Sequence, residues 1–152
     1  MKINGQEIKG LNTIDLVLPR TNSDNIVFHF EALQDLSGIL NYMTLPIPKK
    51  RLGKGNVTTE DLNDPTYVEQ VRVFNERQNH WFILESLKPT DIEWDTVVME
   101  DPSTWGNYIT ELADAGISAT EMKLIYAAID EVNSLDEAKM EAARELFQNE
   151  GR

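Results

Sequence analysis

The sequence predicts an α+β fold, in which a short N-terminal antiparallel β-hairpin or sheet is followed by a mainly helical bundle of about four or five helices. Three observations support this prediction. Large apolar residues (Ile, Leu or Phe) occupy every second position over residues 14–18 and 26–30, which is typical of strands. Beyond residue 63, apolar residues recur at helical spacing instead. Asp64-Pro65 and Asp101-Pro102 resemble helix starts, because aspartate caps a helix and proline fits its first turn.

The β element with one short helix is expected within residues 1–45. Asn4-Gly5 is typical of a two-residue hairpin turn, where both central residues need a positive φ. Polar residues at 21–25 separate the two alternating runs, which therefore predict an antiparallel pair of strands. Apolar residues from Leu33 to Met43 follow helical spacing and predict one short helix across this sheet.

Residues 46–63 are predicted to form an extended, mobile loop. Pro46 and Pro48 exclude a helix, and the segment that follows them is charged, contains glycine and has no periodicity. Its basic residues are the candidate partner-binding residues. We expect them to contact an acidic protein, or the acidic half of a neighbouring copy in a head-to-tail homo-oligomer. These candidates are Lys49, Lys50, Arg51 and Lys54.

The helical part is expected over residues 64–150. Its first helix begins at Asp64 and ends near Leu87, before Pro89. Ile92 and Trp94 alternate with acidic residues and predict an extended link or a third strand. The first helix carries an apolar stripe at Tyr67, Val71, Phe74, Trp81 and Leu84.

Three further helix starts follow along the chain. Asp101-Pro102 begins a helix that Gly116 ends, and Ser118 with Glu121 forms a capping box for the next helix. Ser134 with Glu137 forms another capping box, for the last helix. We expect residues 1–152 to form a single domain, because a chain of this length supports one core. The core-facing positions of the last helix are Met140, Ala143 and Phe147.

The charge of the chain is strongly acidic and unevenly distributed. The net charge is -12, and residues 1–88 contribute -1 of it whereas residues 89–152 contribute -11. Such a field repels phosphate backbones, so nucleic acid is not an expected partner. No run approaches the roughly 20 apolar residues of a membrane span, and the N-terminus lacks the apolar run of a signal peptide. We therefore expect a cytoplasmic protein that does not bind membranes.

No residues stand out as a catalytic, cofactor or metal site. The chain has no cysteine, so it has no thiol nucleophile and no thiolate zinc site. His29 and His80 have no second histidine at metal-ligand spacing. Gly53-Lys54-Gly55 lacks the spacing of a phosphate-binding loop. We accordingly expect a protein that is not an enzyme and needs no cofactor.

One acidic pattern resembles the start of a calcium-binding loop. Asp91, Glu93 and Asp95 alternate as the first ligands of such a loop do. Thr96 then stands where the loop requires glycine, and Pro102 stands where it requires a bidentate glutamate. These carboxylates are therefore expected to face solvent while Ile92 and Trp94 face the core.

A succession of short motifs covers most of the chain. It comprises Pro46-x-Pro48, Asp64-Pro65-x-Tyr67, Trp81 with Ser86-Leu87, residues 92–97, Asp101 to Tyr108, Glu111-Leu112, Ala115-Gly116, Glu121, Asn133-x-Leu135 and Ala142-Ala143-Arg144-x-x-Phe147. In this order the motifs resemble small tail proteins of long-tailed, siphovirus-like bacteriophages, of the tail assembly chaperone type. The resemblance implies a protein of the bacterial host cytoplasm that binds the tape measure protein and tail tube subunits during tail assembly. The resemblance implies no catalytic residue in this sequence.

Three other functions stay open at this level. The chain is alternatively a structural subunit of the tail or head-tail connection, in which case mature particles contain it. A small acidic phage protein that inhibits or regulates a host protein is the second alternative, and it requires the acids of residues 89–152 to line one face. An enzyme would need a pocket of carboxylates with strongly shifted pKa values, which a sequence does not reveal.

Overall fold

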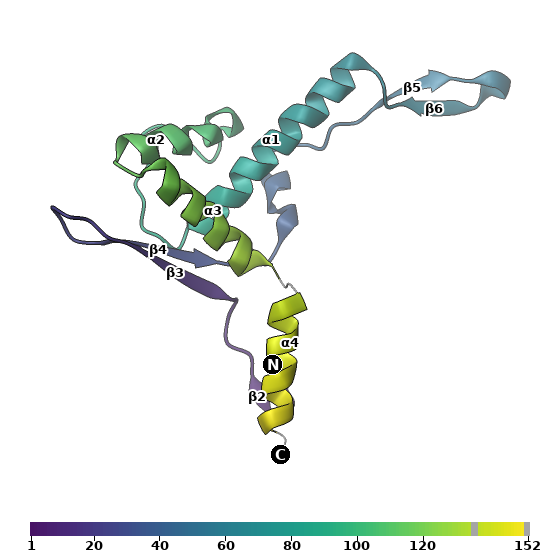
Figure 1. Ribbon diagram of the computed structural model, residues 1–152. Helices are drawn as coiled ribbons and strands as arrows, with labels where there is room; N and C mark the ends of the chain where they lie inside the picture. Colours follow the sequence, from purple (N-terminus) through teal and green to yellow (C-terminus); the bar gives the residue numbers. More distant parts are fainter. Residues whose placement is uncertain (135–136, 151–152) are drawn as a thin grey trace. The chain divides into compact units, whose positions relative to one another are not determined.

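A computed structural model describes residues 1–134 and 137–150 and confirms the α+β fold (Figure 1). The chain divides into two compact units. Unit 1 comprises Met1–Leu33, Ser86–Thr90 and Ala119–Arg152, and unit 2 comprises Gln34–Glu85 and Asp91–Ser118. The chain therefore passes four times from one unit to the other. We expect both units to fold together as a single domain over residues 1–152, and this stays a prediction.

Unit 1 begins with a small hairpin. Strands β1 (Lys2–Ile3) and β2 (Gln6–Glu7) pair antiparallel. Asn4 and Gly5 between them have φ angles of 52° and 80°. The turn predicted from the Asn-Gly pair is confirmed, because a two-residue turn of this kind requires a positive φ at both positions.

A second hairpin provides the sheet of unit 1. Strands β3 (Thr13–Leu18) and β4 (Ile26–Glu31) pair antiparallel, with Leu16 opposite Phe28, and confirm the two predicted strands. Alternation places Leu18, Phe28 and Phe30 on the buried face. The rings of Phe28 and Phe30 stack with their centroids 6.1 Å apart. The opposite face of the hairpin is exposed.

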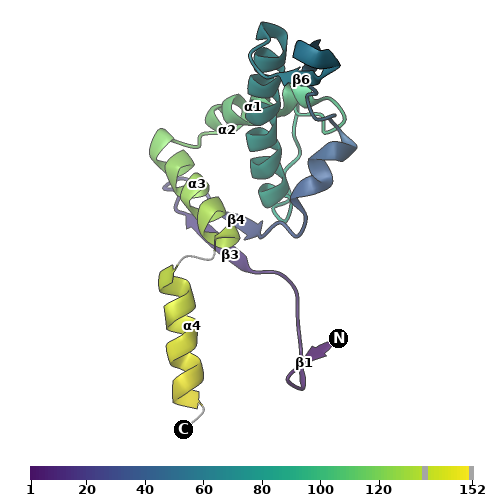
Figure 2. The ribbon, with the colours of Figure 1, turned by 90° about the vertical axis from the view of Figure 1, so that its right-hand side faces the viewer.

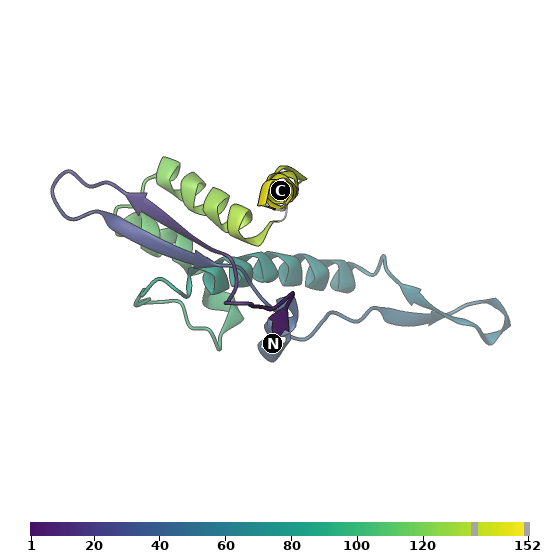
Figure 3. The same ribbon diagram turned by 90° about the horizontal axis from the view of Figure 1, so that it is seen from below.

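Helix α3 (Ala119–Asn133) covers the buried face of this hairpin (Figure 1 and Figure 3). Ile125, Ile129 and Val132 lie on one side of the helix and are almost completely buried. Arg20, just beyond β3, donates two hydrogen bonds to Glu121 in the first turn of α3, at 2.6 and 3.1 Å. The helix predicted to begin after Ser118 is therefore confirmed, and its apolar side is buried.

A buried side-chain network holds the end of α3 in place. The side-chain oxygen of Asn133 accepts a hydrogen bond from the backbone N–H of Leu33 at 2.9 Å. Its side-chain nitrogen donates to the hydroxyl of Ser86 at 3.2 Å and to the carbonyl of Ile129 at 2.8 Å. Ser86 is fully buried, so these hydrogen bonds replace the ones its hydroxyl would form with water.

Unit 2 contains most of the long helix α1 (Pro65–Leu87), whose predicted bounds are confirmed. Asp64 caps it by accepting the N–H of Tyr67 at 3.1 Å. The predicted helix at 33–43 is shorter than expected, because only the 3₁₀ helix η1 (Leu36–Asn41) forms there (Figure 2). Gly38 of η1 lies so near the indole of Trp81 that a Cβ atom at this position would be 3.1 Å from the ring.

The second Asp-Pro pair also begins a helix. Asp101 caps the 3₁₀ helix η3 (Pro102–Asn107) by accepting the N–H of Ser103 at 3.1 Å. Helix α2 (Tyr108–Asp114) follows directly and ends before Gly116, which has a φ of 100°. The fully buried indole of Trp105 donates to the carbonyl of Met99 at 3.1 Å. Residues 91–99 form no strand, so the third strand considered for this segment is absent.

The expectation of an extended loop at residues 46–63 is wrong, because this segment contains a hairpin. Strands β5 (Lys49–Leu52) and β6 (Thr58–Asp61) pair antiparallel (Figure 1). Residues of the 3₁₀ turn η2 (Lys54–Asn56) reverse the chain with φ angles of 75° at Gly55 and 60° at Asn56. Both faces of the hairpin are exposed, so no alternation of apolar residues marks its strands in the sequence.

The last predicted helix is confirmed as α4 (Glu137–Glu150). Of its three expected core-facing residues, Ala143 is exposed, whereas the side chains of Met140 and Phe147 lie outside the described residues. Among the helices that the structure describes, none is long and apolar enough to cross a membrane.

Replacing Asn133 by alanine tests the buried network of unit 1. Asn133→Ala leaves the hydroxyl of Ser86 and the N–H of Leu33 without these partners, so the free energy of unfolding should fall by about 1–3 kcal/mol. Asn107→Ala is the control, because Asn107 is exposed and its side chain makes, among the described residues, only a long 3.5 Å hydrogen bond. Urea unfolding followed by circular dichroism measures both; equal losses would contradict the role of the network.

Candidate protein-binding site

The four predicted partner-binding residues lie together on the β5–β6 hairpin, and all four are exposed. The strand register places Lys49 opposite Asp61 and Lys50 opposite Glu60. Arg51 instead faces Thr59, and Lys54 lies in the turn. Opposite charges across a hairpin attract each other, so the two lysines near its base are partly compensated within the hairpin. The uncompensated positive charge of the hairpin is therefore at its turn.

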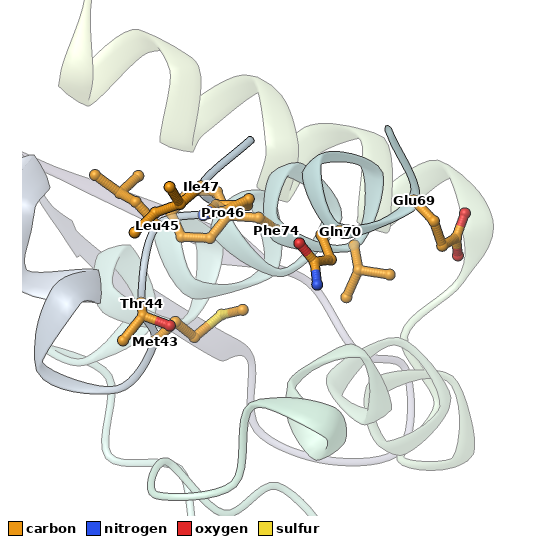
Figure 4. A pocket seen from close by; sticks show the side chains of 9 residues that line it. Met43, Thr44, Leu45, Pro46, Ile47, Glu69, Gln70 and Phe74 are labelled. Atoms are coloured by element: carbon orange, nitrogen blue, oxygen red, sulfur yellow. The ribbon is translucent and has the colours of Figure 1, made fainter. Parts of the chain in front are cut away.

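An apolar groove of about 530 Å³ is formed by residues directly before β5 and by α1 (Figure 4). We call it the apolar groove. The segment Met43–Ile47 forms one of its sides, and the other side belongs to the first half of α1. The residues from α1 are Glu69, Gln70, Val73 and Phe74.

Two prolines explain why this groove stays open. Pro46 and Pro48 keep the segment extended and remove backbone N–H groups, so it continues neither as a helix nor as a central strand. Leu45 and Ile47 consequently expose 57% and 81% of their surface, whereas Phe74 is buried. Large apolar side chains exposed next to one another mark interaction sites more often than isolated ones do. From the sequence alone, Leu45 and Ile47 are expected in or beside a loop and not as binding residues, although the spaced prolines were the available signal.

The rim of the apolar groove is charged. Arg72 donates to Glu69 at 2.8 and 3.0 Å and to Glu76 at 2.9 Å. The hydrogen bond from Arg72 holds the pKa of Glu69 below its usual value and so favours its ionised form. An apolar interior with an ionised rim is the arrangement of a site for an amphipathic segment of another protein.

A second groove, of about 350 Å³, lies between the segment 92–95 and α2, and we call it the acidic groove. Its apolar residues include Ile92, Trp94 and Leu112. Its carboxylates are Glu93, Asp95, Glu111 and Asp114.

Glu111 shapes the acidic groove. Its carboxylate accepts the N–H of Asp95 at 2.6 Å, and the N–H and hydroxyl of Thr96 at 3.2 and 2.7 Å. Desolvation alone would raise the pKa of Glu111, but these hydrogen bonds outweigh it and hold the pKa below its usual value. In the described part of the chain, no three acidic or histidine side chains are grouped as they would be to hold a metal ion.

The two histidines take part in local contacts. His29 lies on the exposed face of β4, where its Nδ1 is 2.7 Å from the carboxylate of Asp15 on β3. His80 is partly buried in α1, with its ring edge-on to Tyr108 at a centroid distance of 5.7 Å. These are the cross-strand and packing contacts of ordinary structural side chains.

Comparison with models of protein families, with curated proteins and with solved structures gives no match. The candidate site is therefore defined by its own residues: the apolar groove, the acidic groove and the basic hairpin of unit 2.

The pH dependence of unfolding tests the role of Glu111. Because its pKa is lowered on folding, the stability that Glu111 contributes is present above its ordinary value of 4.5 and is lost as the pH falls below it. Glu111→Gln should therefore lower the free energy of unfolding by about 1 kcal/mol at pH 7, and by less as the pH decreases.

Glu93→Gln is the control for this measurement, because Glu93 is exposed and lines the same groove. Its effect should stay within about 0.5 kcal/mol across the pH range. Thermal or urea unfolding at several pH values gives both curves. A loss in Glu111→Gln that is the same at pH 7 and at pH 3–4 would contradict the charged hydrogen bonds as its cause.

Proposed function

We propose that this chain is a non-catalytic protein-binding protein that acts as a phage tail assembly chaperone in the cytoplasm of the bacterial host. Its partners would be the tape measure protein and tail tube subunits. The observation that carries the proposal is the apolar groove, where Leu45 and Ile47 are exposed beside Phe74. This groove suits an amphipathic helix that presents apolar residues on one side.

The dimensions of the apolar groove support a weak and reversible contact. A groove of about 530 Å³ takes a few side chains, and each fully buried Leu, Ile or Phe contributes about 1.5–3 kcal/mol. Association costs at least about 4 kcal/mol, so two or three such side chains leave only a small net affinity. A chaperone that releases its client during assembly needs an affinity of this kind.

The charge of the chain supports the same function. A net charge of -12 makes copies repel one another and keeps a complex with an apolar client dispersed. The apolar groove itself has a charged rim, formed by Glu69 and its partner Arg72, which restricts the apolar contact to the groove. The alternative of a structural subunit of the tail or head-tail connection shares the binding surface but predicts that mature particles retain the chain.

Co-expression in bacteria tests the proposal. The tape measure protein of the same phage is expressed with and without the tagged chain, and its soluble fraction and its recovery with the tag are measured. We expect both to increase when the chain is present. A tape measure protein that is neither solubilised nor recovered would overturn the chaperone proposal, and mass spectrometry that finds the chain in purified particles would support the structural alternative.

A single substitution locates the binding site. Ile47→Asp places a carboxylate in the apolar groove at a position that is 81% exposed, so the fold should tolerate it. Recovery of the tape measure protein should fall at least about tenfold, because burying an unpaired charge costs more than 1.4 kcal/mol. Leu124→Asp is the matched control, since Leu124 is 47% exposed on α3, outside the groove. Equal recovery with both variants would exclude the apolar groove as the site.

A further inference from the structure

The β5–β6 hairpin protrudes beyond the start of α1 (Figure 1 and Figure 3). Every residue from Lys49 to Glu60 is exposed, so none of the described residues forms a covering layer over it. Leu52 and Val57, on either side of the turn, expose 72% and 59% of their surface. A two-stranded hairpin is only marginally stable by itself in water. A partner that covers the turn would therefore stabilise the hairpin and bury these two apolar side chains.

The chemistry of the turn specifies an acidic partner. We call residues 51–57 the hairpin tip. The tip contains two basic side chains, Arg51 and Lys54, and no acidic one, whereas Lys49 and Lys50 face Asp61 and Glu60 across the strands. In the part of the chain that the structure describes, neither Arg51 nor Lys54 forms an ion pair. The tip thus combines two cations with two exposed apolar residues.

The acidic groove has the complementary composition. Ile92, Trp94 and Leu112 provide apolar contact, and Glu93 and Asp114 provide exposed carboxylates. Carboxylates stabilise an arginine or lysine side chain through charge-assisted hydrogen bonds, and the face of an indole ring stabilises it through a cation–π contact. Glu111 fixes the backbone of residues 95–96, so this side of the groove needs no ordering when a partner binds.

We propose that the chain associates with copies of itself head to tail, with the hairpin tip of one copy seated in the acidic groove of the next. The occupant follows from charge and shape, because a protruding tip with two cations meets a concave groove with four carboxylates. The tip and the groove consist of different residues, so each added copy offers a free tip and a free groove to further copies. This self-association is independent of the proposed chaperone function.

The contact is expected to be weak. A hairpin tip in a groove of about 350 Å³ buries less surface than the roughly 1,200 Å² of a stable interface. The net charge of -12 on each copy opposes association as well. The assembly should therefore be in rapid equilibrium and increase with protein concentration, which sedimentation velocity resolves as a rising weight-average sedimentation coefficient.

Charge reversal at the tip tests the contact. Arg51→Glu with Lys54→Glu should raise the dissociation constant at least about tenfold, because like charges then meet in the groove. Lys9→Glu with Lys123→Glu is the matched control: both positions are exposed in unit 1, and both double variants change the net charge from -12 to -16. The control should associate more strongly than the tip variant, because it carries the same added net charge and keeps the basic tip. Association of the tip variant to the same extent as the control would overturn the proposal, as would an unmodified chain that stays monomeric at every concentration.

Mixing two variants tests the pairing of tip and groove directly. Glu93→Lys with Asp114→Lys reverses the two exposed charges of the groove, takes the groove from four negative charges to a net charge of zero and leaves the chain at -8, so this variant alone should associate less than the unmodified chain. Combined with the tip variant, the two new lysines of its groove meet an acidic tip, and its own basic tip meets an acidic groove. The mixture should then sediment faster than either variant alone, and attraction between net charges does not explain this because both chains are acidic. If each variant sediments in the mixture as it does alone, the proposed head-to-tail contact is overturned.

Discussion

The packing of α3 on the β3–β4 hairpin is the contact on which unit 1 depends. A two-stranded sheet of this kind has one apolar face. The sheet becomes stable only when another layer of structure covers that face and excludes water from it. Ile125 and Ile129 of α3 provide this layer over Phe28 and Phe30. The same requirement applies to β5–β6, where the described residues provide no layer. The same physical constraint thus explains the core of unit 1 and leaves the hairpin of unit 2 without the covering layer that it requires.

Local interactions made most of the fold predictable from the sequence. Asp64 and Asp101 each cap a helix with a hydrogen bond to a residue two or three positions ahead, so the signal and the structure lie within a few residues. The turn at Asn4-Gly5 is equally local. The strands β3 and β4 were predictable because one buried face imposes alternation on them.

The features that were not predicted from the sequence either depend on contacts between distant residues or lack a buried face. β5 and β6 bury neither face, so alternation does not reveal them. The basic residues Lys49 and Lys50 were evident from the sequence, but the register that sets them opposite Asp61 and Glu60 was not. The apolar groove combines Met43–Ile47 with residues of α1 that lie more than twenty positions away. The sequence therefore indicated the basic part of the candidate site and left its apolar part unrecognised.

The interleaving of the two units limits how this protein can be divided or recombined. Unit 1 takes its residues from the start, the middle and the end of the chain, and unit 2 occupies the two intervals between them. A cut at any one position between Leu33 and Ala119 leaves fragments in which at least one unit is incomplete. Neither groove can therefore be transferred to another protein with its whole unit as one continuous segment, because any segment that contains all of unit 2 also contains Ser86–Thr90 of unit 1.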